Sequence, residues 1–315
     1  MKTVLITGVN GFVGQHLARE LHSRGAEVFG LGRDDTIASA LESVVSRYFS
    51  CDLTNEDAVA KLPLGNVSAI VNLAGLASVS KSFANEALYK DVNVRVATSL
   101  GNTLARTDYR PRIIAISTGG VYDANQALPL TEDSKLTENG SPYVTSKRLM
   151  EVAVEGYKLE GLECFIARPF NHTGPGQESG FLIPDLYRKI LDALAGDGHV
   201  HVGNLQSRRD YTDVRDIARA YASLALAEKD ALHHAVYNIC SGISRSGQEI
   251  LDELKANIPG ADQITLVQDP GLLRANDPAE LIGNARRLFE DTAWAPLLPF
   301  KDTIRDFVAA KKAAA

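Results

Sequence analysis

Short apolar runs alternate with longer amphipathic segments over the first 170 residues of the chain. The runs that predict strands are 3–6, 27–31, Ser68–Leu73, Arg112–Ser117 and Cys164–Arg168. Helical patterns lie between them, around 55–62, 83–106 and 143–160. Strands that alternate with helices of this length are typical of parallel βαβ units. The pattern predicts an α/β fold with a Rossmann-type, doubly wound parallel sheet.

The alternation fails after about residue 170. Loops that contain Gly and Pro mix there with short helices, and a strand-like run returns at Val236–Cys240. We interpret residues 1–170 as the Rossmann domain, rejoined by about 210–242. Residues 171–315 are then mainly a smaller, interleaved C-terminal part.

Composition and charge exclude several classes of protein. The 315 residues include 33 Lys and Arg against 39 Asp and Glu, a net charge of −6, which argues against a broad nucleic-acid-binding face. No apolar run approaches the roughly 20 residues that cross a membrane. The three cysteines are scattered, which favours reduced thiols in the cytoplasm, and the seven histidines form no metal-binding pattern.

Three glycines follow the first strand directly, in the stretch TGVNGFVG. Gly8, Gly11 and Gly14 stand where a sharp turn opens a helix. Glycines at this junction let a pyrophosphate approach the backbone, and the helix N-terminus then faces the anion. The turn therefore predicts a dinucleotide site, to which we also assign Asn10, Phe12 and Val13.

The end of the second strand indicates which dinucleotide is bound. It reads Leu31-Gly32-Arg33, without the carboxylate that usually meets the ribose hydroxyls of NAD. A guanidinium pairs well with a 2′-phosphate, so Arg33 favours NADP(H). Asp34 and Asp35 follow immediately, so NAD(H) remains possible if the strand ends later.

A tyrosine and a lysine stand four residues apart in a predicted helix. Tyr143 and Lys147 lie one turn apart and share a helix face. The ammonium charge would lower the phenol pKa, so that Tyr143 could exchange a proton with a substrate oxygen. Upstream, Thr118 follows a predicted strand and could hydrogen-bond the same oxygen. We predict that these three residues are catalytic.

Together these motifs resemble the extended short-chain dehydrogenase/reductases of the nucleotide-sugar epimerase/dehydratase family. The similarity covers nearly the whole chain and lies in TGVNGFVG, CDLTN, NLAGLA, Asn93, STGGVY, YVTSK, RPFNHTGPGQ, SRRDYTDVRD and YNICSG. It implies further cofactor contacts from Asp52, Leu53, Leu73, Ala74, Gly75, Asn93 and Arg168, beside Tyr143 and Lys147. It also implies a homodimer, built through helices that include 143–160.

The resemblance further implies a nucleotide-sugar substrate. Thr118 and Asn171 would contact it, and Arg209 and Arg274 would hold its diphosphate. A salt bridge to Asp210 or Asp213 is the alternative role for Arg209. Residues 171–315 would thus be mainly substrate-binding.

Gly120 helps to choose among the reactions of the family. Family dehydratases carry an acidic residue at this position and the 3,5-epimerase/reductases a cysteine, whereas glycine can neither accept nor donate a proton. The 168–177 loop is similar to that of GDP-4-keto-6-deoxy-D-mannose reductases, which implies NAD(P)H-dependent reduction of a 4-keto group to give GDP-D-rhamnose. The alternatives are a dTDP- or UDP-linked 4-keto-sugar reductase, a 4-epimerase with bound NAD, and a non-catalytic NAD(P)-binding regulator.

Overall fold

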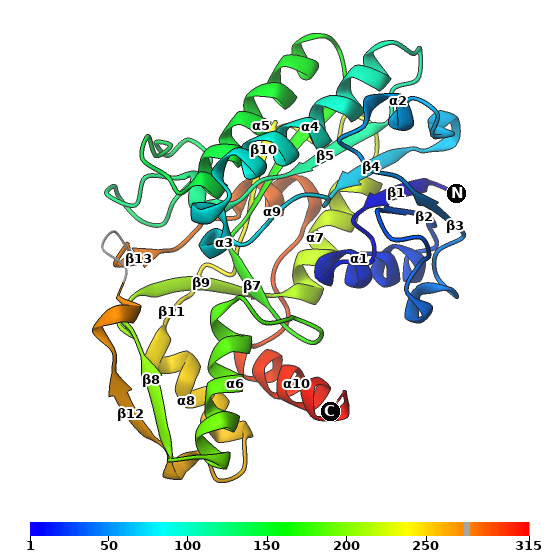
Figure 1. Cartoon of the computed structure of the whole chain (residues 1–315). Coiled ribbons are helices and arrows are strands. Elements are labelled where there is room, and N and C mark those ends of the chain that lie inside the picture. Colours follow the sequence, from blue (N-terminus) through cyan, green and yellow to red (C-terminus); the bar gives the residue numbers. More distant parts are fainter. Residues whose placement is uncertain (274–277, 315) are drawn as a thin grey trace.

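A seven-stranded parallel sheet forms the larger part of the molecule. The computed structural model describes residues 1–273 and 278–314. The strands run in the order β10-β6-β5-β4-β1-β2-β3, and every neighbouring pair is parallel (Figure 1). Their bounds are β1 (Thr3–Thr7), β2 (Glu27–Gly32), β3 (Arg47–Ser50), β4 (Ala69–Asn72), β5 (Arg112–Ile116), β6 (Cys164–Pro169) and β10 (Val236–Ile239).

Helices cover both faces of this sheet. Successive strand residues point to opposite faces, so Val4 packs into the same apolar core as Leu17, while Leu5 packs into the core that holds Leu100. The first core is closed by α1 (Phe12–Ser23), α7 (Val214–Leu226) and α9 (Arg286–Thr292), the second by α2 (Glu56–Val59), α4 (Glu86–Ala105) and α5 (Pro142–Leu159). The prediction of a doubly wound Rossmann-type sheet is confirmed.

Two local details differ from the predicted pattern. The helix expected over 83–106 is divided at Asn85 into α3 (Val79–Ala84) and α4, because Asn85 leaves helical geometry at φ −139°. The edge strand β3 (RYFS) carries no continuous apolar run: Arg47 and Ser50 are exposed, and the two aromatic residues between them are only partly covered. It was therefore absent from the predicted strands.

The second part of the molecule has a core of its own. Strands β11-β9-β13 form a sheet in which β7 also pairs with β9, and β12 pairs with β8. The strands are β7 (Asn171–Thr173), β8 (His199–Val202), β9 (Arg208–Asp213), β11 (Ser244–Ser246), β12 (Thr265–Gln268) and β13 (Glu280–Leu281). The helices α6 (Leu182–Ala195), α8 (Gly247–Asn257) and α10 (Phe300–Ala313) pack against them through apolar side chains.

The chain passes repeatedly between the two parts. After β9 it returns to the large sheet as α7 and β10, leaves it again at β11, and comes back as α9 before α10 (Figure 1). Short 3-10 turns complete the described elements: η1 (Ser39–Leu41), η2 (Leu64–Asn66), η3 (Gly119–Val121), η4 (Ala261–Gln263) and η5 (Pro270–Leu272). Within residues 1–273 and 278–314, no helix has the length and apolar character to cross a bilayer.

Candidate active site

The glycine turn between β1 and α1 has the shape of a diphosphate cradle. Gly8 has a φ of +67°, which favours glycine, and a Cβ on Gly14 would lie 2.4 Å from the Gly8 carbonyl oxygen. Gly11 caps α1 without a side-chain hydrogen bond, and the first helical turn carries no acidic residue. The N-terminal N–H groups of α1 can therefore face an anion, so the residues present fit a dinucleotide.

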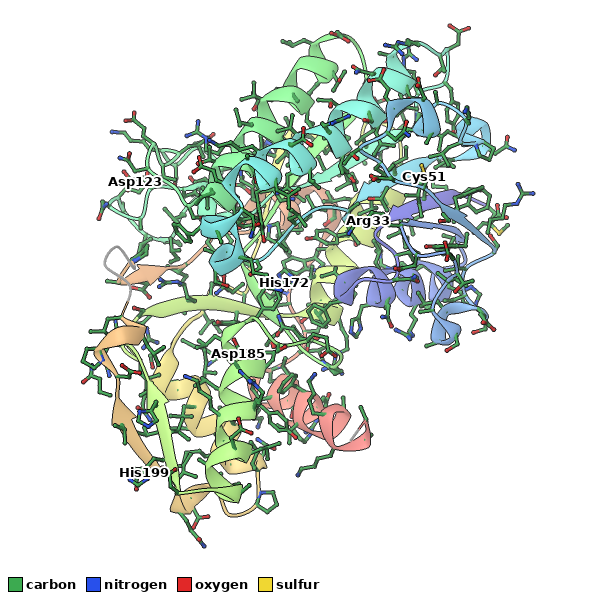
Figure 2. The ribbon with its side chains drawn as sticks, viewed as in Figure 1. Arg33, Cys51, Asp123, His172, Asp185 and His199 are labelled. Atoms are coloured by element: carbon green, nitrogen blue, oxygen red, sulfur yellow. The ribbon has the colours of Figure 1, made fainter. Side chains whose placement is uncertain are left out.

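The loop after β2 fixes the surroundings of Arg33. Strand β2 ends at Gly32, so Arg33 is the first residue beyond it. The Asn10 amide donates to Asp34 Oδ2 at 2.7 Å and accepts from the Ala38 N–H at 2.9 Å. Asp34 is thus engaged by the glycine turn. Arg33, labelled in Figure 2, is exposed, and its positive charge helps to lower the pKa of the Asp52 carboxyl.

Residues Asp52 and Leu53 follow β3 on the same side of the sheet as Arg33. Thr54 donates both its N–H and its hydroxyl to Asp52 Oδ1, and these hydrogen bonds lower the pKa of the Asp52 carboxyl. Leu53 is buried in the core under α4. Asp52 is therefore an oriented carboxylate next to the loop that carries Arg33.

Hydrogen bonds hold the segment after β4, where Leu73, Ala74 and Gly75 lie. The Ala74 N–H donates to Thr7 Oγ1 at 3.0 Å, and Thr7 donates to Asn72 Oδ1 at 2.7 Å. Gly75 has a φ of +149°, and a Cβ there would lie 2.6 Å from Asn93 Oδ1. The roles of Thr7 and Asn72 were missed in the sequence, because partners 65 residues apart give no local signal.

Asn93 joins this segment to the helix that carries the tyrosine. Its side chain accepts from the Leu76 N–H at 2.8 Å and donates to Ser146 Oγ at 2.8 Å, and Ser146 donates to the Tyr143 carbonyl at 2.7 Å. Asn93 therefore positions the first turn of α5, a function that the sequence pattern did not indicate.

Thr118 and Tyr143 meet at the carboxyl end of β5. Ser141 caps α5 by accepting from the Val144 N–H at 3.3 Å, which places Tyr143 in the first turn of the helix. A side-chain hydrogen bond with Thr118 lowers the pKa of Tyr143, but the larger effect of burial raises that pKa to about 12. Lys147 is not among the groups that lower this pKa, so the lowering that we expected from its charge is not seen.

Lys147 lies one turn further along α5, and its side chain is buried. Its Nζ donates to the Ile116 carbonyl at 2.7 Å, at the end of β5. Burial lowers the pKa of Lys147 to about 8, and the nearby Glu151 carboxylate opposes that shift. The structure therefore brings the three predicted catalytic residues to one edge of the sheet.

Arg168, which we expected at the cofactor site, is held by the side chains of Glu151 and Tyr122. Its Nε and Nη2 donate to the two Glu151 carboxylate oxygens at 2.9 and 2.8 Å, and Nη1 donates to the Tyr122 hydroxyl at 3.0 Å. Both members of the ion pair are almost completely buried. The guanidinium is therefore occupied by a contact that joins β6 to α5, and the structure supports a structural role for Arg168.

Two of the expected substrate residues, Asn171 and Arg209, lie in β7 and β9. Asn171 is exposed in β7, and its backbone pairs with Tyr211 of β9. Arg209 Nη1 donates to the carbonyls of Arg208 and Pro278 at 2.7 and 2.8 Å. Arg274 lies outside the described residues.

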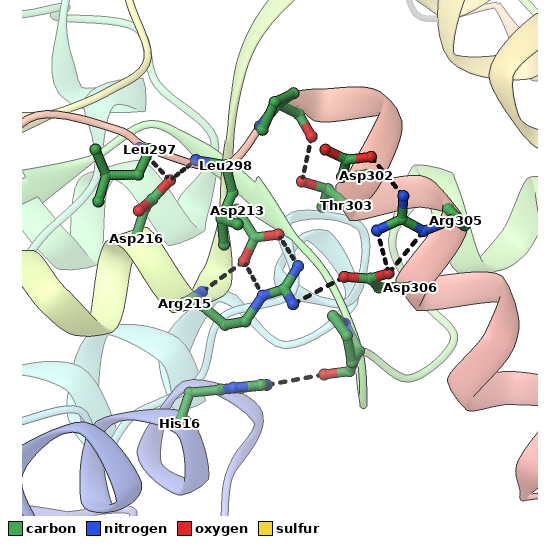
Figure 3. A network of polar contacts seen from close by, with 12 residues as sticks. His16, Asp213, Arg215, Asp216, Leu297, Leu298, Asp302, Thr303, Arg305 and Asp306 are labelled. Atoms are coloured by element: carbon green, nitrogen blue, oxygen red, sulfur yellow. Dashed lines mark hydrogen bonds and ion pairs between the residues drawn. The ribbon is translucent and has the colours of Figure 1, made fainter. Parts of the chain in front are cut away.

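The two carboxylates proposed as alternative partners of Arg209 have other partners. Asp210 accepts from the Ser241 and Gly242 N–H groups, at 2.8 and 2.9 Å. Asp213 forms an ion pair with Arg215, whose guanidinium also reaches Asp306 of α10 (Figure 3).

The family is decided by comparison with known proteins. Residues 4–240 match the NAD dependent epimerase/dehydratase family. This chain belongs to that family. It is 32% identical over 307 residues to a GDP-6-deoxy-D-mannose reductase from Pseudomonas aeruginosa, covering 96% of this chain and 94% of the relative. It is also 28% identical over 292 residues to a GDP-6-deoxy-D-talose 4-dehydrogenase from Aggregatibacter actinomycetemcomitans, covering 90% and 89%.

Solved structures of family members have the same fold. The structure of RMD from Pseudomonas aeruginosa complexed with NADPH superposes with a TM-score of 0.84 at 27% identity, over 100% of both chains. A UDP-glucose 4-epimerase from Thermotoga maritima gives a TM-score of 0.86 at 23% identity over 99% of both chains, which is a likeness of fold. The protein is therefore an NAD(P)-dependent oxidoreductase by family.

Proposed function

We propose that this family member is a reductase that converts the 4-keto group of a nucleotide-linked 6-deoxy sugar into a hydroxyl group. The best candidate reaction is GDP-4-keto-6-deoxy-D-mannose to GDP-D-rhamnose. The observation that carries the proposal is the pairing of Thr118 with a half-buried, protonated Tyr143 at the carboxyl end of β5. The reductase relative from Pseudomonas aeruginosa, similar over nearly the whole chain, supports the same reaction.

The proposed chemistry needs a hydride and one proton at a single carbon. The nicotinamide, when bound, supplies the hydride that adds to C4. Tyr143 holds a proton that it can donate to the O4 oxygen as the carbonyl becomes an alcohol, and Thr118 orients that oxygen by a hydrogen bond. Lys147, one helical turn from Tyr143, would hold the nicotinamide ribose through its ammonium group.

The surroundings of Thr118 agree with chemistry at one carbon. Thr118 Oγ1 accepts from the Gly120 N–H at 3.1 Å, which fixes the hydroxyl at the start of η3. Gly120 itself brings no acid or base, so 4,6-dehydration and 3,5-epimerisation lack the extra proton-transfer group that they need. A plain reduction uses only groups that the site holds.

We infer that NADP(H) is the preferred cofactor. Arg33 is exposed and follows the last residue of β2, while Asn10 donates to the Asp34 carboxylate. A 2′-phosphate carries the charge and the oxygens that an arginine pairs with bidentately.

The first experiment supplies freshly generated GDP-4-keto-6-deoxy-D-mannose with NADPH or with NADH. Loss of the reduced nicotinamide is followed by absorbance, and the product is identified by mass and by its sugar stereochemistry. Rapid oxidation with formation of GDP-D-rhamnose would support the proposal, and the ratio of the two rates gives the cofactor preference. No oxidation with either cofactor would contradict this substrate.

The same assay separates the alternative functions. Oxidation of NADPH by a dTDP- or UDP-linked 4-keto sugar would support a reductase whose substrate carries that nucleotide in place of GDP. Interconversion of 4-epimers without net cofactor consumption would instead identify an epimerase with bound NAD. Tight cofactor binding without turnover of any of these sugars would indicate a non-catalytic NAD(P)-binding protein.

We also propose that the protein is a homodimer, formed through α4 and α5. These helices lie side by side on one face of the sheet (Figure 1), and large apolar side chains stay exposed on them, among them Leu88, Leu149 and Val152. A second copy of the same face would cover these side chains. Light scattering coupled to size exclusion measures the mass, and Val152→Glu, placed on this face, should shift a dimer to monomer.

We place the enzyme in the cytoplasm. Cys51, Cys164 and Cys240 are buried free thiols in the structure. A reducing compartment preserves such thiols and supplies nucleotide sugars and NADPH. Fractionation of the native cells would test this location.

A further inference from the structure

The loop over residues 170–177 wraps the first turns of α1, next to the glycine turn. The His172 ring stacks on the Phe12 ring, with centroids 6.3 Å apart and planes inclined by 11°. His16 Nε2 lies 2.9 Å from the Pro175 carbonyl oxygen, a contact that Figure 3 marks beside the Arg215 network. A Cβ on Gly176 would lie 4.0 Å from the Phe12 ring. Phe12 is therefore enclosed by this loop.

The same loop is held firmly from its other side. A carbonyl can only accept, so His172 Nδ1 carries the proton that it donates to the Phe170 carbonyl at 3.1 Å. Burial lowers the pKa of His172, which keeps the ring neutral near pH 7. Gln177 donates to the His172 carbonyl at 3.1 Å and accepts from Thr173 Oγ1 at 2.7 Å. A displacement of the His172 ring must therefore move the backbone that carries it.

Asn171 is the neighbour of His172 in β7 and points to the opposite side of the strand. Asn171 is exposed, whereas His172 packs between β7 and α1 near the middle of the molecule (Figure 2). One short strand thus carries a proposed substrate contact on one side and a contact with the dinucleotide turn on the other. The two binding sites share that strand.

We propose that the Phe12–His172 stack is a positioning contact that couples cofactor binding to nucleotide-sugar binding. A diphosphate bound to the N–H groups of the first turn of α1 fixes Phe12, and the stack then fixes His172 and the direction of Asn171. This inference rests on the proposed function, because it assigns substrate contact to Asn171. By thermodynamic linkage, the sugar nucleotide must strengthen cofactor binding by the same factor.

The test measures affinities of two ligands that do not react with each other. GDP is titrated into the full chain by calorimetry, with and without saturating NADP⁺, and NADP⁺ is titrated with and without GDP. We expect GDP to bind about threefold to tenfold more tightly when NADP⁺ is present, the range that a stacked ring pair contributes. If GDP does not bind, UDP and dTDP are titrated in the same way.

Variants at His172 separate coupling from simple binding. His172→Leu removes the stacked ring and should bring the coupling factor to about one, with the affinity for GDP alone changed by less than about twofold. His172→Phe keeps the ring, loses only the hydrogen bond to Phe170, and should keep most of the coupling. The matched control is His234→Leu, which breaks a ring pair with Tyr237 in another part of the chain and should leave the factor unchanged.

Each outcome decides between the two proposals. A coupling factor of one in the wild type, or a factor retained in His172→Leu, overturns the inference and leaves the proposed reductase intact. Failure of every nucleoside diphosphate to bind the wild type overturns both. If His172→Leu does not fold, Phe12→Leu removes the other ring of the stack and keeps the backbone N–H group of residue 12. This variant must then lose the coupling between NADP⁺ and GDP binding.

Discussion

The ion pair between Arg168 and Glu151 gives a quantitative test of the structure. The pair is bidentate, with 2.9 and 2.8 Å between donors and acceptors, and its side chains are only 4% and 3% exposed. Arg168→Met would leave the Glu151 carboxylate buried without its counter-ion. Breaking a buried pair in this way costs about 3–5 kcal/mol of the free energy of unfolding.

The assay is urea denaturation followed by circular dichroism. Arg168→Met combined with Glu151→Leu should recover most of the lost stability, because an apolar replacement of a buried pair is often neutral. The control is Lys90→Met, which breaks an exposed pair with Glu86 that lies 2.6 Å apart and should change stability by about 0.5 kcal/mol or less. A loss below about 1 kcal/mol for Arg168→Met would refute the reasoning.

The double variant also tests the expected cofactor role of Arg168. If the guanidinium is purely structural, the stable double variant should bind NADPH with an affinity within about twofold of the wild type. A loss greater than about tenfold, in a variant of restored stability, would return Arg168 to the cofactor site. Fluorescence titration of NADPH makes the measurement.

Four further predictions concern the proposed chemistry. Tyr143→Phe should lower turnover by orders of magnitude and leave the NADPH dissociation constant nearly unchanged; near-normal turnover would contradict the assignment. Arg33→Ala should lower the affinity for NADPH about tenfold or more relative to the affinity for NADH, and equal losses of affinity for both cofactors would remove the argument for NADP(H). Gly14→Ala should abolish cofactor binding measured by calorimetry, since its Cβ would lie 2.4 Å from the Gly8 carbonyl oxygen; normal affinity would refute the cradle. The rate of reduction should decline above about pH 8, because Lys147 loses its proton there while Tyr143 keeps its proton to about pH 12. Lys147→Arg should move the decline to higher pH, and a wild-type rate that rises from pH 8 to 10 would contradict these two pKa values.

The sequence predicted the large sheet because its signals are local. The apolar runs of β1, β4, β5 and β6 are buried on both faces, and the three glycines after β1 stand only three residues apart in the chain. Strand β9 reads as polar, RRDYTD, because its carboxylates satisfy distant groups: Asp210 binds the turn at Ser241. No periodicity indicates such a strand.

In the candidate site, too, the sequence predicts what depends on neighbouring residues and misses what depends on contacts between distant ones. Tyr143 and Lys147 are one turn apart, so their spacing alone places them on one helix face, as the structure has them. The partner of Arg168 stands on another element, 17 residues away, and its presence changes the interpretation of that arginine. The pKa of Tyr143 likewise depends on burial, which residue spacing does not report.

The return of the chain to the large sheet has a consequence for synthesis on the ribosome. Strand β6 ends at Pro169, but its outer neighbour β10 begins only at Val236. While the intervening residues are translated, one edge of β6 exposes unpaired backbone N–H and carbonyl groups, which can pair with other chains. A nascent chain of about 200 residues is therefore expected to be more prone to aggregation than the finished protein, and a chaperone that shields sheet edges would act in this interval.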